Sequence, residues 1–381
     1  MKHLLSALKK GMSRFFRTAD MTLFILCVAA SLCGLLLIAS AARELPGGAL
    51  RYLAMQGAAL MIGVAAFMLF SFVDIEHISA LWKWIAAFNL LAILALIPFG
   101  VERGGNRAWI QWRFISIQPA EIVKLTFILL LACHMYALRD VLNRPLPMLS
   151  LAAHAFGYAV LVMVISNDMG SALVFLVIFI VMLIVAGARL WWFLIAGGAG
   201  AALWPLFWNV VLRADQRARI LIVYNPESDP LGKGWNLLQS MRAIAGGGLF
   251  GQGLFKGTLT QGSFGTLPAK WTDFIFAVCA EELGLIGCLL IVGLLTAIIV
   301  RCLYVCTRAK SPLSMLFCAG VVGWLFFQTF ENIGMCLGLT PVIGLTLPFI
   351  SYGGTSTMAL FAAMGMVSGV YMRPVPGWLK T

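Results

Sequence analysis

Charged residues are scarce in this sequence. They make up 11% of its 381 residues, whereas soluble domains carry about 25%. Apolar residues make up 61% and gather in runs near the length of a membrane span, which a soluble protein with one core could not hide. The composition excludes a soluble globular protein and predicts an all-α integral membrane protein. The net charge of +12 then serves topology and contact with membrane lipid, so it does not indicate nucleic-acid binding.

Paired cysteines and internal repeats are also missing. The nine cysteines all lie in or beside apolar runs, and none forms a Cys-x-x-Cys pair. They therefore indicate small residues of a membrane core rather than a disulfide or metal framework. No internal repeat is apparent, which disfavours a transporter built from inverted repeats.

Ten apolar runs predict ten membrane-spanning helices, which would place both termini on one side of the membrane. Basic residues are more frequent on the side of the termini, so the positive-inside rule makes that side cytoplasmic. The first run follows basic residues as in a signal peptide, but it is longer than a signal core, so we expect an uncleaved helix. The predicted spans are about 22–42, 52–73, 80–100, 121–138, 149–166, 170–187, 189–212, 272–305, 313–337 and 355–372.

The expected domain organisation is simple. A basic cytoplasmic segment, 1–21, precedes a single membrane domain, 22–372, and a cytoplasmic tail, 373–381, follows it. The longest outer loop, 213–271, exceeds ordinary connectors and carries aromatic residues among its glycines. We expect this extracellular loop to be structured and to pack on the outer face of the membrane domain.

Three carboxylates, Asp273, Glu281 and Glu282, lie in or at the mouth of the eighth predicted span. An ionised side chain costs about 2.5–3.5 kcal/mol at the centre of a membrane helix, so such residues are rare and usually functional. Asp273, at the outer end, is either a helix N-terminal acid stabilised by the macrodipole or a general base facing the outer compartment. The residues alone leave both interpretations open.

Glu281 and Glu282 lie about 12 Å deeper than Asp273 and on different faces of a helix, so we do not expect them to share one role. Intramembrane acids usually face the bundle interior and pair there. Lys124 is the expected partner, with Glu121 three residues earlier as a competitor. A structural ion pair is the favoured interpretation.

Two outer segments carry further candidates. In 103–121, arginines are interspersed with tryptophans, which is typical of an aromatic belt with snorkelling arginines or of a site for an anionic lipid headgroup. In 340–356, prolines and glycines interrupt helical continuity, which is tolerated at membrane depth where the backbone is buried or lines a wet cavity. We expect this second segment to be re-entrant and to line a cavity beside Asp273.

Several short motifs follow one another over residues 100–373. They are Trp109-Ile110, Gln118-Pro119-Ala120-Glu121 with Lys124, Asn225-Pro226-Glu227-Ser228-Asp229-Pro230-Leu231-Gly232, Gln239-Ser240, Thr272-Asp273-Phe274-Ile275-Phe276-Ala277, Glu281-Glu282-Leu283-Gly284, Asn332-Ile333-Gly334-Met335 and Leu347-Pro348-Phe349-Ile350-Ser351-Tyr352-Gly353-Gly354. In this order, on a ten-span pattern, they closely resemble the SEDS family, the RodA, FtsW and SpoVE group of bacterial cell-wall proteins. The motifs from Asn225 and Asn332 look more like RodA than FtsW.

The resemblance implies a peptidoglycan glycosyltransferase in the bacterial cytoplasmic membrane, serving cell shape, division or sporulation. Such proteins polymerise lipid II into glycan strands at the outer face and work with a class B penicillin-binding protein, a transpeptidase. The family's essential acid corresponds to Asp273, and its functional tryptophan to Trp109. A divalent cation, Mg²⁺ or Mn²⁺, could assist the basic residues at the diphosphates, although no ligand cluster in the sequence demands one.

Further site residues are expected on the same grounds. The candidates for binding substrate, beside Trp109, are Arg103, Arg107, Arg113, Lys124, Gln239, Ser240, Lys256, Lys270, Ser351 and Tyr352. The candidates for a structural polar network are Glu121, Glu281, Glu282 and Asn332.

The chain also departs from the family pattern. Ala269 and Trp271 stand where Glu and His are common, Ser116 where Arg is common, and Asn167 where Pro is common. These departures leave Asp273 in place and indicate a divergent paralogue. Two other functions stay open: a flippase or transporter of the lipid-linked precursor, and a non-catalytic scaffold for the transpeptidase.

Overall fold

The computed structural model describes residues 15–112, 115–229, 232–262 and 267–373, and these are mostly helical. Eight helical stretches among them are long and apolar enough to cross a membrane, which confirms the prediction of a helical membrane protein. They are α2 (Met21–Ala41), α3 (Gly48–Ser71), α5 with α6 (Trp82–Leu94 and Leu96–Phe99), α7 (Pro119–Ala137), α8 (Pro145–Ser166), α10 with the π-helix η2 (Leu190–Leu206 and Phe207–Val211), α14 (Ile275–Thr307) and α15 (Pro312–Cys336).

Two further helices belong to the same bundle. They are α9 (Met169–Val185), which is apolar but shorter at 17 residues, and α16 (Gly354–Tyr371). Both coincide with predicted spans, 170–187 and 355–372. The short helices α4 (Ile75–Ser79) and η1 (Arg139–Val141) lie in connections between the long ones.

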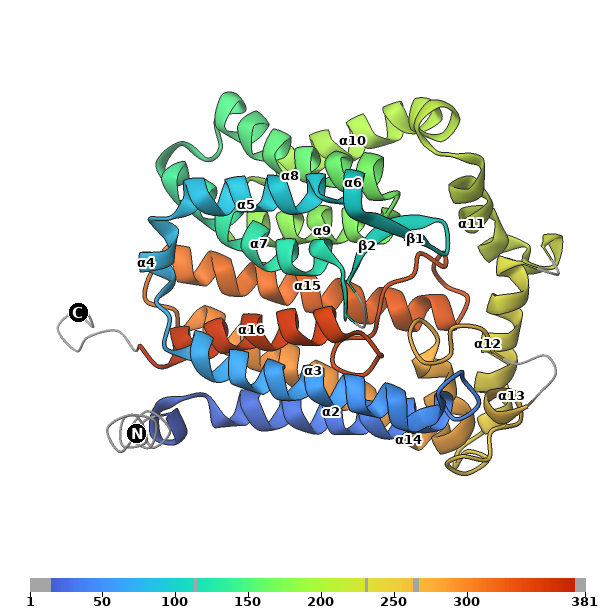
Figure 1. Ribbon diagram of the computed structural model, residues 1–381. Coiled ribbons are helices and arrows are strands. Elements are labelled where there is room, and N and C mark those ends of the chain that lie inside the picture. Colours follow the sequence, from blue (N-terminus) through green and yellow to red (C-terminus); the bar gives the residue numbers. More distant parts are fainter. Residues whose placement is uncertain (1–14, 113–114, 230–231, 263–266, 374–381) are drawn as a thin grey trace.

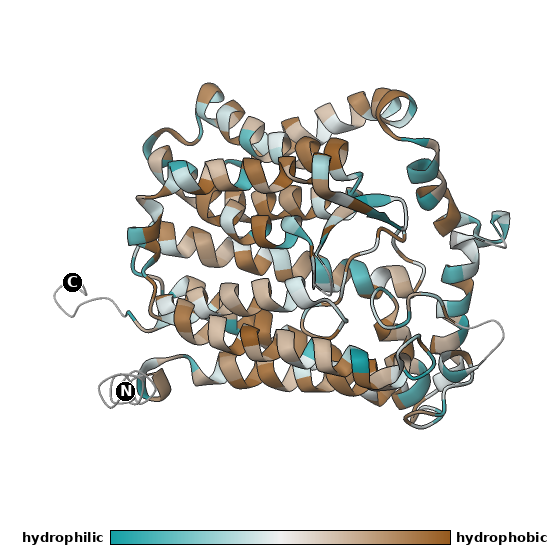
Figure 2. Ribbon diagram, viewed as in Figure 1, coloured by the Kyte–Doolittle hydropathy of each residue, from teal (hydrophilic) through white to brown (hydrophobic). Residues whose placement is uncertain are grey.

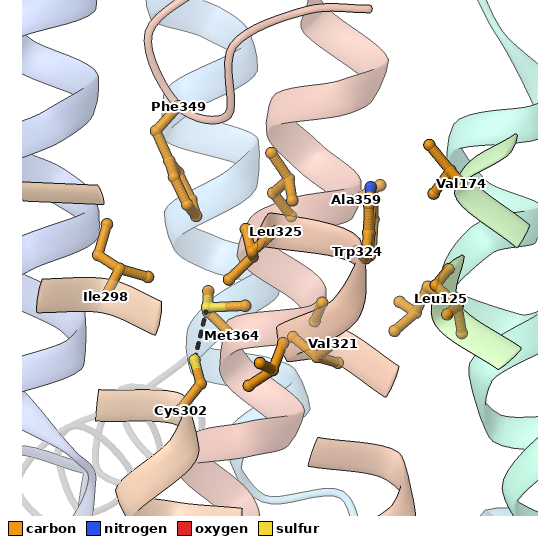
Figure 3. Close-up of a cluster of buried hydrophobic side chains, with 14 of the residues drawn as sticks. Leu125, Val174, Ile298, Cys302, Val321, Trp324, Leu325, Phe349, Ala359 and Met364 are labelled. Atoms are coloured by element: carbon orange, nitrogen blue, oxygen red, sulfur yellow. Dashed lines mark hydrogen bonds between the residues drawn. The ribbon is translucent and has the colours of Figure 1, made fainter. Parts of the chain in front are cut away.

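Helix α15 lies inside the bundle, where α7, α9 and α14 pack against it, while α16 packs on α3 (Figure 1). Figure 3 shows the apolar core around Trp324 of α15, with Leu125 and Val174 on one side and Leu325 and Met364 on the other. Trp324 is fully buried. By contrast, α10 has no buried residue, and Figure 2 shows it as largely hydrophobic.

A small antiparallel sheet lies where the sequence predicted an irregular outer loop. Its strands are β1 (Gly100–Arg103), β2 (Asn106–Trp112) and β3 (Ile115–Ile117), in the order β1-β2-β3. The expectation of an all-α fold is therefore wrong at this point. Gly104 and Gly105 both have positive φ, 60° and 85°, and they connect the paired residues Arg103 and Asn106. Two glycines in this conformation form the tight turn that suits the twist of a hairpin.

The stretch from 213 to 271 contains helices of its own. They are α11 (Ala214–Tyr224), η3 (Pro226–Ser228), α12 (Lys233–Gly247) and α13 (Thr258–Gln261), and α12 packs against α14. Figure 1 shows this stretch and the sheet at one end of the bundle, with α4 and both ends of the described chain at the other. We call the end of the bundle that carries the sheet and the stretch 213–271 the sheet end. Teal, hydrophilic residues are frequent in α11 and α12 (Figure 2).

Candidate active site

Asp273 lies at the sheet end, in a turn that directly precedes α14. The carbonyl oxygen of Ala269 accepts the backbone N–H groups of Thr272, Asp273 and Phe274, at 3.1, 3.1 and 3.3 Å. Ala269 adopts φ 46°, a left-handed conformation that costs free energy for a residue other than glycine. The helix begins after the turn, with Phe274 as its N-cap and without a side-chain capping hydrogen bond, so Asp273 lies directly before the helix N-terminus.

Helix α15 and the segment 338–354 hold this turn in place. The Nδ2 of Asn332 donates to the carbonyl oxygens of Asp273 (2.8 Å) and Leu345 (2.7 Å). The Oγ of Ser351 donates to the carbonyl oxygen of Thr272 (2.6 Å), and the N–H of Tyr352 donates to that of Trp271 (2.9 Å). The Asn332 amide thus links two backbone carbonyl oxygens, and the Ser351 hydroxyl is likewise bound to the protein itself.

The environment of the Asp273 carboxyl makes it a stronger base than an ordinary aspartate. Burial raises the pKa of Asp273 from 3.8 to about 6, although a hydrogen bond from Thr272 and the charge of Arg219 lower it, and the charge of Asp168 raises it further. Gly344 leaves room beside the carboxylate, because a Cβ there would lie 3.6 Å from Oδ2. A general base with a pKa near 6 is largely ionised at neutral pH and still accepts protons effectively.

Glu281 and Glu282 do not bind Lys124, which corrects the expected ion pair. Both carboxylates hold the loop 252–261 instead. Glu281 accepts the N–H groups of Leu259 (2.7 Å) and Thr260 (2.9 Å) and the hydroxyls of Thr258 (3.1 Å) and Thr260 (2.5 Å). Glu282 accepts the hydroxyl of Ser40 (2.6 Å), the N–H of Phe255 (3.2 Å) and the amide of Gln261 (3.1 Å).

Helix α14 is interrupted directly after the two acids, where the residues before their loop pack against it. Gly284 has φ 68°, and a Cβ there would collide with the backbone of Leu249 and Gly251. The N–H groups of Leu285 and Ile286 donate to the carbonyl oxygens of Gly248 and Leu249, at 2.9 and 3.3 Å. Because both Glu281 and Glu282 hold the loop 252–261, the expectation that they have separate roles is wrong.

Lys124 pairs with Glu121, the competitor named from the sequence. Their Nζ and Oε1 atoms lie 2.6 Å apart, and both residues are buried. The Nζ also lies 5.5 Å from the ring centroid of Trp324. The Oε2 of Glu121 has no hydrogen-bond partner among the described residues.

The other expected substrate-binding residues fall into two groups. Arg103, Arg107 and Lys256 are exposed at the sheet end. Arg103 donates to Gln111 (2.9 Å), and its guanidinium lies 5.6 Å from the centroid of the Trp109 ring. Arg107 donates to the carbonyl oxygen of Gly100 (3.1 Å). Buried are Gln239, Ser240, which donates to the carbonyl oxygen of Cys336 (2.9 Å), and Lys270, which donates to that of Thr260. Arg113 lies outside the described residues.

Three charged residues near Asp273 were not among the sequence candidates. Asp168 caps α9 by accepting the N–H of Ser171 (2.9 Å), and it accepts the amide of Gln118 (3.2 Å). Arg219 of α11 is 6% exposed and lies 4.0 Å from Asp215. Glu331 of α15 is 2% exposed. Glu331 carried the same signal as Glu281, an acid inside an apolar run, and could have been found by it.

No three His, Cys, Asp or Glu side chains in the described ranges are arranged to hold a metal ion. Asp273, Asp168 and Glu331 share one region, but they do not form such a group. We therefore assign no step of the reaction to a bound cation.

Comparisons with known proteins agree with this architecture. The family model FtsW/RodA/SpoVE, described as a cell cycle protein, matches residues 20–374. The chain is 34% identical to the peptidoglycan glycosyltransferase MrdB of Escherichia coli K12, over 74% of this chain and 75% of that one. A chain from a peptidoglycan synthase complex superposes with a TM-score of 0.76 at 30% identity, covering 93% and 98% of the two chains. The rod shape determining protein RodA of Thermus thermophilus superposes with a TM-score of 0.66 at 27% identity, covering 93% of this chain and 97% of that one.

Proposed function

Because this chain belongs to the FtsW, RodA and SpoVE family and is a peptidoglycan glycosyltransferase, we propose that Asp273 is the general base of glycan polymerisation. The observation that carries the proposal is the environment of the Asp273 carboxyl. It has a pKa of about 6 and stands on a turn whose backbone is fixed by Asn332 and Ser351. A base held in one position, with a pKa just below neutral pH, suits the removal of a proton from a sugar hydroxyl.

The proposed reaction joins two lipid II molecules. The Asp273 carboxylate takes the proton of the 4-hydroxyl of the acceptor sugar, and an O–H bond forms on the carboxylate as the hydroxyl O–H bond breaks. The freed oxygen attacks the anomeric carbon of the donor. The bond from that carbon to the diphosphate breaks, and undecaprenyl diphosphate leaves with the electron pair.

Basic residues at the sheet end would stabilise the diphosphates, where negative charge develops. Arg103, Arg107 and Lys256 are exposed there and could reach a headgroup at the membrane surface. Arg219 is buried, and its charge acts on Asp273, so it would balance the carboxylate in the resting site.

The proposed topology has ten spans, with both termini cytoplasmic and the sheet end outside. α9 and α16 would supply two further crossings beside the eight stretches that are long and apolar enough to cross a membrane. Both ends of the described chain lie opposite the sheet (Figure 1), which suits an even number of crossings. A class B penicillin-binding protein is the proposed partner, since a structurally similar chain comes from a peptidoglycan synthase complex.

The flippase interpretation loses its main support in the contacts of the intramembrane charges. Its support was that Lys124, Glu281 and Glu282, as intramembrane charges, would suit a polar pathway. Lys124 is instead paired with Glu121, and both glutamates are held by backbone and side-chain donors of the loop 252–261.

Polymerisation by the purified protein tests the proposal. Asp273→Asn should form no glycan ladder from lipid II, while Asp140→Asn, a surface control whose acid side chain is 83% exposed in η1, should polymerise normally. The absence of ladders from the unaltered protein would favour the scaffold. Near-normal ladders from Asp273→Asn would remove Asp273 from its proposed role.

A further inference from the structure

A line of buried polar side chains runs along α15 toward Asp273. Trp324, Gln328 and Glu331 follow one another at offsets of four and three, which places them on the same face of the helix. They are 0%, 0% and 2% exposed. Among the described residues, the Trp324 Nε1, both polar atoms of the Gln328 amide and both oxygens of the Glu331 carboxyl have no hydrogen-bond partner.

Helix α7 supplies the inner end of this line. α7 packs against α15, and Lys124 lies against the Trp324 ring, with Glu121 one turn closer to the sheet end. α7 starts at the sheet end and α15 finishes there, so the two helices run antiparallel. The polar side chains of both helices therefore extend in the same direction, from the Lys124–Glu121 pair toward the candidate site.

Glu331 is the outer end of the line and lies next to the candidate base. Its neighbour Asn332 donates to the carbonyl oxygen of Asp273, and its own carbonyl oxygen accepts the hydroxyl of Thr340 (3.2 Å). The negative charge of Asp273 acts on Glu331. Among the described residues, the charges of Arg219 and Asp168 also act on Asp273, and those of Glu331 and Asp273 act on the buried Cys336 thiol.

A buried carboxyl with two unpaired oxygens is not stable as an anion. Removing an isolated carboxylate from water costs far more free energy than burying a neutral acid, unless a cation or several donors compensate. Lys124 is already paired with Glu121, and the charge of Arg219 acts on Asp273. A neutral Glu331, however, carries an O–H group that itself needs an acceptor, and buried polar atoms of this kind are commonly bridged by internal water.

We propose that Glu331 is a positioning residue, which keeps its proton and donates a hydrogen bond toward the Asp273 carboxylate through an internal water. This inference rests on the proposed role of Asp273 as the base. The hydrogen bond favours the ionised form of Asp273 and fixes its orientation, so Glu331 assists the base without touching the substrate. The remaining polar atoms of Gln328 and Trp324 continue the same hydrated line toward Glu121.

Two substitutions of Glu331 test this assignment through the pH dependence of polymerisation. Glu331→Gln keeps the size of the side chain and a neutral donor. The acidic limb of its pH–rate profile, where the rate falls as the pH decreases, should therefore stay within a few tenths of a pH unit of that of the unaltered protein. Glu331→Leu removes the donor and should move the acidic limb upward by about one pH unit, which corresponds to about a fivefold loss of rate at pH 6. Thermal unfolding of both variants in detergent identifies any that fail to fold.

Each other outcome overturns the assignment. If Glu331 were ionised, both substitutions would remove a negative charge and move the acidic limb downward. If it were only a packing residue, folded Glu331→Leu would keep the original limb. Asp273→Asn in the same assay separates the two proposals. If Asp273→Asn is active, the assignment of Asp273 as the base is wrong. If Asp273→Asn is inactive and Glu331→Leu keeps the original acidic limb, only the assignment of Glu331 is wrong.

Discussion

The acids buried in helix α14 and the acid buried in helix α15 differ in how they are partnered. Glu281 and Glu282 are completely buried, and seven hydrogen bonds from the loop 252–261 and Ser40 reach their oxygens. Glu331 is equally buried, yet neither of its oxygens has a partner among the described residues. Asp273, beside it, has a pKa raised to about 6 by burial.

The difference teaches how a structural acid can be distinguished from a functional one. A carboxylate whose oxygens accept four or three hydrogen bonds is stable as an anion, and it serves to hold a loop. A carboxyl without such donors is costly in its charged form, so it holds its proton to higher pH and can take part in proton transfer or donate a hydrogen bond near neutral pH. The number of donors around the acid, rather than its depth in the membrane, is therefore the informative quantity.

The largest effect is expected from removing one of the structural acids, which tests whether it stabilises the fold. Glu281→Ala removes the acceptor of the buried Thr260 N–H and hydroxyl and of the partly buried Leu259 N–H. It should lower the free energy of unfolding by about 3–5 kcal/mol, as expected for loss of one member of a buried charged network. Thermal unfolding in detergent measures the effect, with the exposed-site variant Asp140→Asn as control. A fully stable Glu281→Ala with reduced activity would show instead that Glu281 acts in the reaction.

A second substitution tests how the proposed base, Asp273, is held in place. Asn332→Ala removes the amide that fixes the carbonyl oxygen of Asp273, so the carboxylate should be less well oriented. We expect kcat to fall about tenfold, equivalent to about 1.4 kcal/mol, with KM little changed. Steady-state kinetics with lipid II measures both constants. A rise of KM at constant kcat would indicate that Asn332 contributes to substrate binding instead.

The smallest expected effect is a gain of stability. Because the pKa of Asp273 is raised in the folded state, the ionised carboxylate destabilises the fold as the pH rises from 3.8 through about 6. Asp273→Asn should therefore unfold at the same temperature or a few degrees higher at neutral pH, in contrast to Glu281→Ala. A marked decrease in the unfolding temperature of Asp273→Asn would place Asp273 with the structural acids.

The sequence allowed the helical membrane architecture and Asp273 to be predicted, because both depend on local patterns. Apolar runs define the helices, and an acid at the mouth of such a run is conspicuous. The family motifs added Asn332 and Ser351, although the structure shows that these two residues hold the turn of Asp273 through its backbone.

The partners of the buried acids could not be predicted in the same way. Charged side chains are the only partners that an apolar sequence suggests for a buried acid, whereas Glu281 is bound by the backbone N–H groups of Leu259 and Thr260. The residues just before that loop, Gly248 and Leu249, pair with α14 at the break at Gly284, and an apolar run that continues through a glycine gives no sign of such a break. The hairpin was missed for a different reason, since Gly104-Gly105 is a recognisable turn signal that the charged and aromatic residues around it obscured.

The pH dependence of kcat/KM for polymerisation by the unaltered protein tests the central claim most directly. If Asp273 is the general base, log kcat/KM should fall with a slope of one as the pH decreases below about 6, because protonation of its carboxyl removes the base. A rate that stays constant to well below that pH, down to the range of an ordinary aspartate near 3.8, would contradict the account.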